Sequence, residues 1–315
     1  MLVRHGAAKW FEELVENEIG GAAHFPGRIG LGTWPIGESG EHRDREIAAI
    51  RHALDIGYRL LDTAEMYADG GAERIIGSAL KAFGASRRSE LYIVSKLVPD
   101  NATREGVVRA CEASIQRMGC QYLDMYLLHW RGPHPFVQTL RGFDDLLRRG
   151  LIRHVGVSNF GVDDLRLWLE AERTVGLPAS TRCNQMPYSA DARGIEYELL
   201  PWQRAHAIQT IAYSPLGRGA LTRNEVLARL GRERGVTGAQ IALAWCLREP
   251  DVIAIPKSAN PQRMQENLAA AALRLSPEEL EQIDRAFPLR FRRLRQSRVF
   301  RQTKSAVRRL LRRRR

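Results

Sequence analysis

Short apolar runs alternate with longer amphipathic stretches along the chain from Arg28 onward. Each apolar run is short enough for a strand and holds few polar residues, which is typical of strands buried on both faces. We predict strands over residues 29–33, 59–63, 91–95, 123–129, 152–157, 182–185, 208–213 and 252–256. The stretches between them repeat apolar residues at helical spacing and predict helices over residues 45–56, 72–83, 104–118, 137–149, 162–175, 196–206 and 238–247.

This alternation of strands and helices predicts an α/β fold, a (β/α)8 TIM barrel formed by a single domain. Right-handed crossovers between parallel strands would close the units into a barrel. Two further helices are predicted over residues 262–272 and 277–287, and the second would begin at a Ser276 cap followed by Pro277. The expected organisation is an N-terminal extension with a candidate helix, the barrel, and a basic tail, over residues 1–27, 28–288 and 289–315.

The formal net charge of +12 comes from one end of the chain. Residues 289–315 hold 13 Lys and Arg and no acid, and the rest of the chain has 35 basic residues against 36 acidic ones. The barrel is therefore near neutral, and its charge gives no reason to expect nucleic-acid binding. For the tail we favour disorder or a solvated extension over contact with nucleic acid or another polyanion, because blocks of like charge are usually unstructured.

The composition disfavours several other classes of protein. No apolar run is long enough to span a membrane, and the N-terminus lacks the apolar core of a signal peptide, so we expect a cytoplasmic protein. The 4 cysteines and 8 histidines show no disulfide framework and no metal-ligand spacing, so no metal is expected. No GxGxxG follows the first strand, which disfavours a Rossmann dinucleotide site. Gly30 and Gly32 are instead expected to let the strand end bend close to the site.

Four chemically active residues lie at or just past the ends of three successive predicted strands. Asp62 lies at the end of the second strand and Tyr67 just past it, Lys96 follows the third, and His129 ends the fourth. A (β/α)8 barrel builds its active site from the C-terminal ends of its strands, so these side chains should meet. Each alone has a structural interpretation, as a turn aspartate, a packed aromatic ring, a strand-end lysine or a barrel-mouth histidine. Together, in this order, they indicate catalysis.

The chain resembles the aldo-keto reductases over about residues 28–287. The matching motifs are Gly-Leu-Gly-Thr-Trp (30–34), Asp-Thr-Ala-Glu-Met-Tyr (62–67), Ser-Lys (95–96), Leu-Leu-His-Trp (127–130), Gly-Val-Ser-Asn-Phe (156–160), Asn-Gln (184–185), Ala-Tyr-Ser-Pro-Leu-Gly (212–217) and Ile-Pro-Lys-Ser (255–258). The segments 62–73 and 193–202 look most like short bacterial members related to methylglyoxal and diketogluconate reductases. The resemblance implies reduction of small aldehydes or ketones with NADP(H), by a monomer.

The four residues would then supply the proton for carbonyl reduction. Tyr67 is the expected acid, and an ammonium from Lys96 would lower the pKa of its phenol. Asp62 would pair with Lys96 and keep the amine charged and in place. His129 would hydrogen-bond the substrate oxygen, as a neutral imidazole.

Cofactor contacts follow from the resemblance and from one helix start. By resemblance, Ser158, Asn159 and Gln185 bind the nicotinamide carboxamide, and Tyr213 stacks on its ring. A helix beginning near residue 260 would present free amides to a phosphate, with Lys257, Ser258 and Arg263 around the adenosine 2′-phosphate, which favours NADP(H) over NAD(H). A solvated helix start is the alternative. The remaining expected cofactor contacts are Gly32, Thr33, Trp34, Ser214, Leu216, Asn260, Glu266 and Asn267.

The substrate pocket is predicted from aromatic and apolar residues near the strand ends. Candidate walls are Trp34, Met66 and Trp130, and more weakly Phe160. Core packing is the alternative for the tryptophans. A protein that binds NADP(H) as a sensor or partner subunit with little turnover is the alternative function, and the complete set of four active residues argues against it.

Overall fold

The computed structural model describes residues 25–177 and 180–289. Its centre is a parallel sheet of eight strands in chain order, β1 to β8. A parallel bridge between Ile29 and Ala254 joins the start of the chain to the last strand and closes the ring. The strands are β1 Leu31–Gly32, β2 Leu60–Asp62, β3 Tyr92–Leu97, β4 Leu123–Leu128, β5 Ile152–Ser158, β6 Thr181–Pro187, β7 Gln209–Tyr213 and β8 Val252–Ala254.

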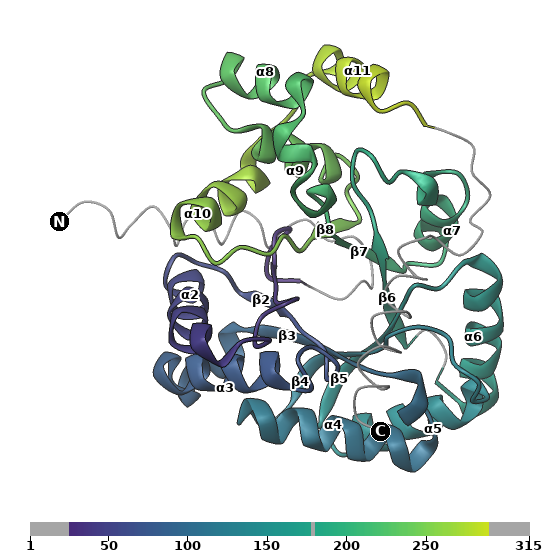
Figure 1. Cartoon of the computed structure of the whole chain (residues 1–315). Helices are drawn as coiled ribbons and strands as arrows, with labels where there is room; N and C mark the ends of the chain where they lie inside the picture. The colour runs from purple at the N-terminus through teal and green to yellow at the C-terminus, as the bar shows by residue number, and fades with distance from the viewer. Residues whose placement is uncertain (1–24, 178–179, 290–315) are drawn as a thin grey trace, which may run out of the picture.

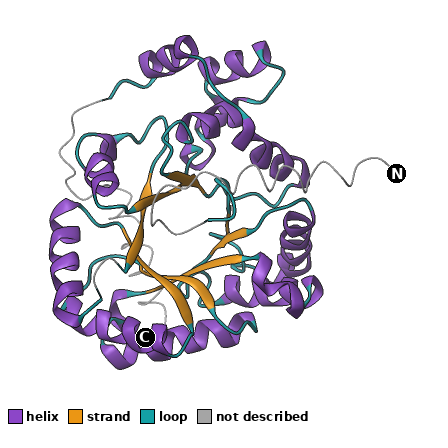
Figure 2. Cartoon of the chain, turned by 180° about the vertical axis from the view of Figure 1, so that it is seen from behind, coloured by secondary structure: helices purple, strands orange, loops and turns teal. Residues whose placement is uncertain are grey.

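Helices surround this ring of strands on its outside (Figures 1 and 2). They are α2 Arg43–Asp55, α3 Gly71–Phe83, α4 Arg104–Met118, α5 Phe136–Arg148, α6 Val162–Val175, α7 Leu199–Ala205, α8 Glu225–Glu233, α9 Gly238–Cys246, α10 Pro261–Ala269 and α11 Pro277–Ala286. The predicted (β/α)8 barrel is therefore confirmed. The candidate helix at residues 10–19 and nearly all of the basic tail lie outside the described residues, and the predicted division of the chain into three parts stays a prediction.

Side-chain caps explain the start of several of the described helices, namely α4, α8, α9, α10 and α11. Ser276 caps α11 with its hydroxyl, and Glu279 returns a hydrogen bond to the backbone amide of Ser276, which completes a capping box. Two helices differ from the prediction. Helix α7 begins only at Leu199, after a short 3₁₀ turn over Gly194–Glu196. Helix α8 was not predicted, because it is short and contains Gly231. The glycine is needed for packing, since an added Cβ there would lie 2.7 Å from the carbonyl oxygen of Val236.

The barrel interior is a compact apolar core that supports the site from below. It comprises Leu60, Tyr92, Val94, Met125, Leu127, Cys183, Ile211, Ile253 and Ile255. Phe25 packs against Tyr92, the first residue of β3, with ring centroids 4.7 Å apart, so it lies at the N-terminal end of the barrel. Tyr213, the last residue of β7, packs on the same core from the C-terminal end. The site is thereby confined to the C-terminal ends of the strands.

The two glycines near β1 allow the ring to close tightly. A Cβ on Gly30 would lie 2.6 Å from side-chain carbons of Leu60, and one on Gly32 would lie 2.7 Å from the carbonyl oxygen of Ile255. The Gly32 amide also donates to the carbonyl of Pro256 at 3.2 Å. Both positions therefore require glycine for close packing. The expected bend of the strand end towards the site stays a prediction. No helix in the described part of the chain is long and apolar enough to cross a membrane.

Candidate active site

Three neighbouring strands deliver the four predicted catalytic side chains to one end of the barrel. Asp62 is the last residue of β2, Lys96 lies near the end of β3, and His129 follows the end of β4. Tyr67 comes from the loop between β2 and α3, where its amide donates to the carbonyl of Ala64 at 3.0 Å. The structure brings all four together, and we call them the acid group.

Lys96 is the centre of the acid group. Its Nζ lies 2.9 Å from Oδ2 of Asp62, 2.7 Å from the carbonyl oxygen of Thr63 and 3.4 Å from the hydroxyl oxygen of Tyr67. An ammonium has three N–H donors, and these three acceptors match them. Lys96 and Asp62 are both buried. A buried charge needs such partners, so the lysine is fixed in position beside the phenol.

The pKa of Tyr67 differs in direction from the sequence prediction. Burial and, to a smaller extent, the Asp62 carboxylate raise the pKa of the Tyr67 phenol well above its ordinary value. The lowering expected from Lys96 does not dominate, because burial of the phenol is the larger effect. Burial also lowers the pKa of Lys96, with Asp62 opposing that change. Tyr67 is therefore a protonated phenol in the absence of bound molecules, which is the form that can donate a proton.

His129 faces the same space as a neutral imidazole. Burial, and then the nearby Lys96, lower the pKa of His129 well below its ordinary value, in agreement with the sequence prediction. Its ring meets that of Tyr67 edge-on, with centroids 5.9 Å apart. Its Nδ1 is buried and has no hydrogen-bond partner among the described residues. A neutral imidazole beside the phenol can accept from or donate to a substrate oxygen without adding charge.

The next three strands deliver polar groups of another kind, which we call the amide group: Ser158, Asn159, Gln185 and Tyr213. The Tyr213 hydroxyl donates to Oδ1 of Asn159 at 2.9 Å, and Nδ2 of Asn159 donates to Oγ of Ser158 at 3.0 Å. Ser158 in turn donates to the backbone carbonyl of Gln185 at 2.9 Å. Asn159 adopts a left-handed backbone with φ 62°, which Asn tolerates better than most residues.

Two hydrogen bonds connect the amide group to the acid group. Nε2 of Gln185 donates to Oδ1 of Asp62 at 2.7 Å, and Nδ2 of Asn159 donates to the carbonyl oxygen of His129 at 3.0 Å. Sequence reasoning assigned Gln185 and Asn159 to the cofactor alone and missed both bonds. The residues of the first pair are 123 positions apart, so no local signal could have indicated the contact. The carbonyl of Thr63, a partner of Lys96, was also missed.

The predicted phosphate site lies at the start of α10. Asn260 caps this helix by accepting from the amide of Arg263 at 3.0 Å, and Pro261 occupies its first turn. Lys257 and Arg263 are exposed, and within residues 25–177 and 180–289 neither side chain forms an ion pair. Ser258 is mostly buried, and its Oγ accepts from the amide of Asn260 at 3.1 Å. Two available cations beside a helix start suit a phosphate.

The other expected cofactor contacts differ in exposure. Glu266 is half-buried and accepts from Nε2 of Gln262 at 2.9 Å, whereas Asn267 is buried. Ser214 has a left-handed backbone with φ 52° directly after β7, and Leu216 follows it in the same loop. Thr33 is buried, and its hydroxyl donates to the backbone carbonyl of Asp62 at 2.9 Å, so this side chain supports the end of β2.

Phe160 is a wrong prediction for the substrate pocket. Its side chain is fully buried among aromatic rings outside the strands, with centroids 5.5 Å from Phe136 and 5.7 Å from Trp168. It follows the end of β5, but the chain has already turned towards α6 there. Its ring therefore belongs to the core between strands and helices.

Two of the other predicted pocket walls, Trp130 and Met66, lie next to members of the acid group. The Trp130 ring lies 4.9 Å from that of His129, and Met66 precedes Tyr67 in the same loop and is half-buried. Trp34 is 46% exposed, and the Arg218 guanidinium lies 5.5 Å from the centre of its ring. Arg218 comes from the loop after β7 and was not singled out from the sequence.

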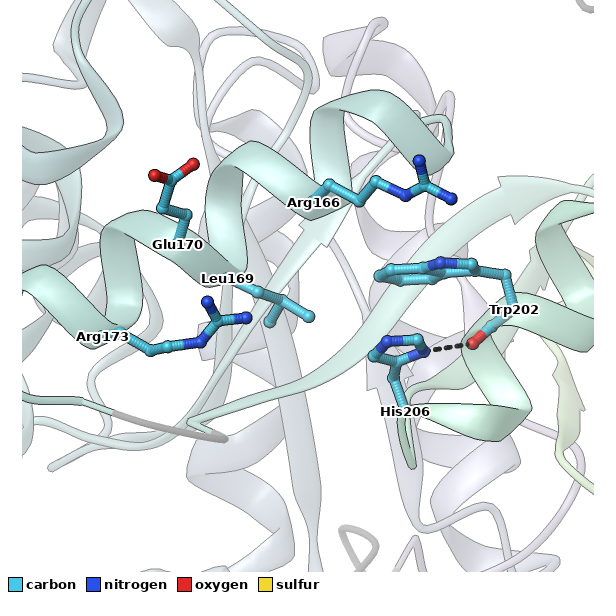
Figure 3. Close-up of a pocket in the computed structure, with 6 residues that line it drawn as sticks. All are labelled: Arg166, Leu169, Glu170, Arg173, Trp202 and His206. Atoms are coloured by element: carbon cyan, nitrogen blue, oxygen red, sulfur yellow. Dashed lines mark hydrogen bonds between the residues drawn. The ribbon is translucent and has the colours of Figure 1, made fainter.

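A surface depression elsewhere is not the site. Figure 3 shows it between α6 and the end of α7, where the Trp202 and His206 rings stack with centroids 3.8 Å apart. Arg166 and Arg173 of α6 also line it. No residue of the acid or amide group contributes to it. In the described part of the chain, no three His, Cys, Asp or Glu residues are placed to hold a metal ion.

Comparisons with known proteins agree with this geometry. The sequence model of the Aldo/keto reductase family matches residues 28–287. The chain is 40% identical to methylglyoxal reductase YeaE of Escherichia coli (strain K12) over 268 residues, which is 82% of this chain and 90% of that protein. It is 34% identical to glyoxal reductase of Bacillus subtilis (strain 168) over 257 residues, which is 81% of this chain and 87% of that protein.

Solved structures give the same result. An aldo-keto reductase from Klebsiella pneumoniae, in a crystal structure with NADPH, superposes with a TM-score of 0.79 at 41% identity. The match covers 85% of this chain and 93% of that one. The family match spans the whole barrel, from Arg28 before β1 to Phe287 after α11. The chain therefore belongs to the aldo/keto reductase family of oxidoreductases, as its motifs predicted.

Proposed function

We propose that the protein reduces small aldehydes and ketones, dicarbonyls such as methylglyoxal among them, with NADPH as the hydride donor and Tyr67 as the proton donor. The observation that carries the proposal is the Lys96 ammonium, held between Asp62 and the Tyr67 hydroxyl at the barrel mouth. Two relatives named for reduction of methylglyoxal and glyoxal, and a similar structure with NADPH, support the substrate class and the cofactor.

Proton delivery follows from the acid group. The raised pKa of Tyr67 keeps the phenol protonated at neutral pH, so a proton is available when negative charge develops on the substrate oxygen. The phenolate that remains would lie 3.4 Å from the Lys96 Nζ. This preorganised cation stabilises the phenolate more than the phenol, which lowers the barrier for proton transfer. Neutral His129 orients the substrate oxygen by a hydrogen bond.

The amide group and the start of α10 have the donors and acceptors to hold NADP(H). The cofactor, when bound, supplies the hydride. Ser158, Asn159 and Gln185 carry hydroxyl and amide groups that suit a carboxamide, and Tyr213 places an aromatic ring next to them. Lys257 and Arg263 suit an additional phosphate, which favours NADP(H) over NAD(H). A cytoplasmic location and a monomeric state stay predictions of the sequence.

Tyr67→Phe tests this proposal directly. We expect wild-type protein to oxidise NADPH in the presence of methylglyoxal or 4-nitrobenzaldehyde. The variant should lose more than about tenfold in kcat, because positioned acid catalysis contributes about 10² to 10⁴. Its affinity for NADPH should be kept, since the phenol belongs to the acid group. Absence of turnover by the wild type on a panel of carbonyls would favour the sensor function instead.

Tyr126→Phe is the matched control. Tyr126 is also a buried tyrosine, but its ring lies between β4 and α5, with its centroid 5.9 Å from that of Phe143, and its hydroxyl has no hydrogen-bond partner among the described residues. Removal of the Tyr126 hydroxyl should leave kcat unchanged. Equal turnover of wild type and Tyr67→Phe would remove Tyr67 from the role of proton donor.

A further inference from the structure

Gln185 occupies a position between the two groups of the site. It lies on β6, on the far side of the barrel from Asp62 at the end of β2, and its Nε2 donates to Oδ1 of Asp62 at 2.7 Å. The second oxygen of the same carboxylate accepts from Lys96 at 2.9 Å. Gln185, Asp62 and Lys96 are all buried. Each carboxylate oxygen therefore has one short bond, and the two bonds fix the carboxylate plane.

This bond also determines how the Gln185 amide faces the rest of the site. Its NH2 group points to Asp62, so its Oε1 is directed away from the carboxylate. Oε1 accepts no hydrogen bond within residues 25–177 and 180–289. It is also not among the fully buried side-chain atoms that lack a partner, so it is not closed off from solvent. Gln185 thus offers an acceptor to the barrel mouth while its donor holds the aspartate.

We propose that Gln185 is a positioning residue for proton transfer: it holds the Asp62–Lys96 pair against Tyr67 through its NH2 group, and links that pair to the cofactor side through its Oε1. The inference rests on the proposed function and deepens it. Loss of the bond would free the Asp62 carboxylate to turn, and Lys96 would then move relative to the phenol. Proton transfer should weaken even when NADPH is saturating.

Gln185→Glu gives this role a distinct signature. A Glu in the same position would place a second carboxyl against Oδ1 of Asp62, and two adjacent carboxylates cannot both ionise easily, so the pKa of the new carboxyl is raised. Below that pKa the Glu is protonated and can donate to Asp62 as Gln does. Above it the donor is lost and repulsion replaces it. The activity of the variant relative to wild type should therefore fall as pH rises.

The surroundings leave Asp62 and Lys96 as the nearest charges that act on the new carboxyl. More distant charges are Glu73 of α3, which acts on Lys96 and is paired with Arg117, and Arg218 after β7, which acts on Tyr213. The other titratable groups are Tyr67 in the loop after β2, His129 after β4, Cys183 on β6 and Tyr213 on β7. Burial raises the pKa of Tyr67, Cys183 and Tyr213 and lowers that of His129. All four are neutral near neutral pH. Lys96 is already paired with Asp62, so it offsets only part of the repulsion.

The experiment measures kcat at saturating NADPH from about pH 5 to about pH 9 for wild type, Gln185→Glu and Gln185→Met, a window that spans a raised carboxyl pKa. The kcat of Gln185→Met should be lower than that of wild type by roughly tenfold to a hundredfold at every pH, which is the effect of losing one hydrogen bond to a charged group. Gln185→Glu should approach wild type at the acid end and match Gln185→Met at the alkaline end. A ratio to wild type that is constant with pH would overturn the proposal.

Gln203→Met is the control for a purely structural effect. Gln203 is equally buried, accepts from Asn184 at 2.7 Å and donates to Thr210 at 2.6 Å, but it has no contact with the acid group. It should lower the melting temperature and leave kcat and its pH profile unchanged. A Gln203→Met profile that resembles that of Gln185→Glu would contradict the assignment.

Thermal unfolding separates this inference from the proposed function, because it needs no turnover. The folded-state pKa of the carboxyl introduced by Gln185→Glu should lie above its unfolded value, so the stability of this variant relative to wild type is highest at low pH and decreases as pH rises through the folded pKa. A melting-temperature difference that is constant from about pH 5 to about pH 8 would overturn the inference, since an unperturbed Glu titrates below this range. A wild type without carbonyl reduction would overturn the proposed function and the role in proton transfer that rests on it, whereas the pH-dependent melting temperature of Gln185→Glu would still report the contact between residue 185 and Asp62.

Discussion

The acid group and the segment that leads to α10 each contain a lysine, but in opposite environments. Lys96 is buried, makes three hydrogen bonds, and has a pKa lowered by burial. Lys257 is exposed and has no ion pair in the described part of the chain. Proton transfer needs a cation whose position and solvation are fixed, whereas phosphate recognition needs a cation that is available to a ligand from solution.

The difference follows from where each residue lies on its strand. Lys96 is inside β3, where it pairs with Leu127 of β4 on one side and accepts from the amide of Glu65 at 3.2 Å on the other, and its side chain is fully buried. Lys257 follows β8 after the strand has ended, on the way to α10. Position along the strand thus decides whether a lysine is enclosed, as the proposed proton transfer requires, or open to solvent, as the proposed phosphate contact requires.

The largest effect that would sharpen this comparison is expected from Lys96→Met. We predict a loss in kcat of about 10² to 10⁴, because the cation that stabilises the phenolate is removed. The same change leaves Asp62 buried without its cation and should lower the free energy of unfolding by about 3 to 5 kcal/mol. Steady-state kinetics and urea unfolding measure the two effects.

A double variant, Lys96→Met with Asp62→Asn, separates stability from catalysis. It should recover part of the lost stability, since no unpaired charge remains, without recovering kcat. Lys96→Met with wild-type turnover would show that the buried lysine takes no part in the chemistry.

A smaller effect on kcat is expected from a change in pH. His129, with a lowered pKa, stays neutral throughout the neutral range, and Tyr67, with a raised pKa, stays protonated. Lys96 is the member of the acid group whose pKa is shifted down towards neutrality, although Asp62 opposes the shift. We therefore predict that kcat at saturating NADPH is level near neutral pH and decreases on the alkaline side as Lys96 loses its proton. A decrease towards acid pH from neutrality would contradict a neutral His129.

The smallest effect concerns the basic tail, which lies outside the described residues apart from Leu289. Truncation after Leu289 should change kcat with methylglyoxal by less than about twofold and stability by less than about 0.5 kcal/mol, as for surface changes away from the core. Salt-sensitive retention on heparin should be lost with the tail if it contacts polyanions. Retention unaffected by truncation would exclude that role.

The sequence predicted the acid group because each member lies at or just past a strand-like run, and a barrel collects such ends at one face. Other features depend on three-dimensional packing. The direction of the shift in the Tyr67 pKa depends on burial and on the nearby Asp62 carboxylate. The bond from Gln185 to Asp62 crosses the barrel. Phe160 was misplaced because a position one residue past Asn159 does not reveal where the chain turns outward.

We propose that the acid group determines turnover and that the start of α10 contributes to NADPH affinity, so that the two can be changed separately. Measuring kcat and the NADPH Kd in three variants tests this separation most directly. Tyr67→Phe should lower kcat and keep the NADPH Kd, and Arg263→Ala should raise the Kd by about tenfold to a hundredfold and keep kcat at saturating NADPH. Arg166→Ala, in the depression of Figure 3, should change neither. Loss of NADPH affinity in Tyr67→Phe, or an unchanged Kd in Arg263→Ala, would contradict this account.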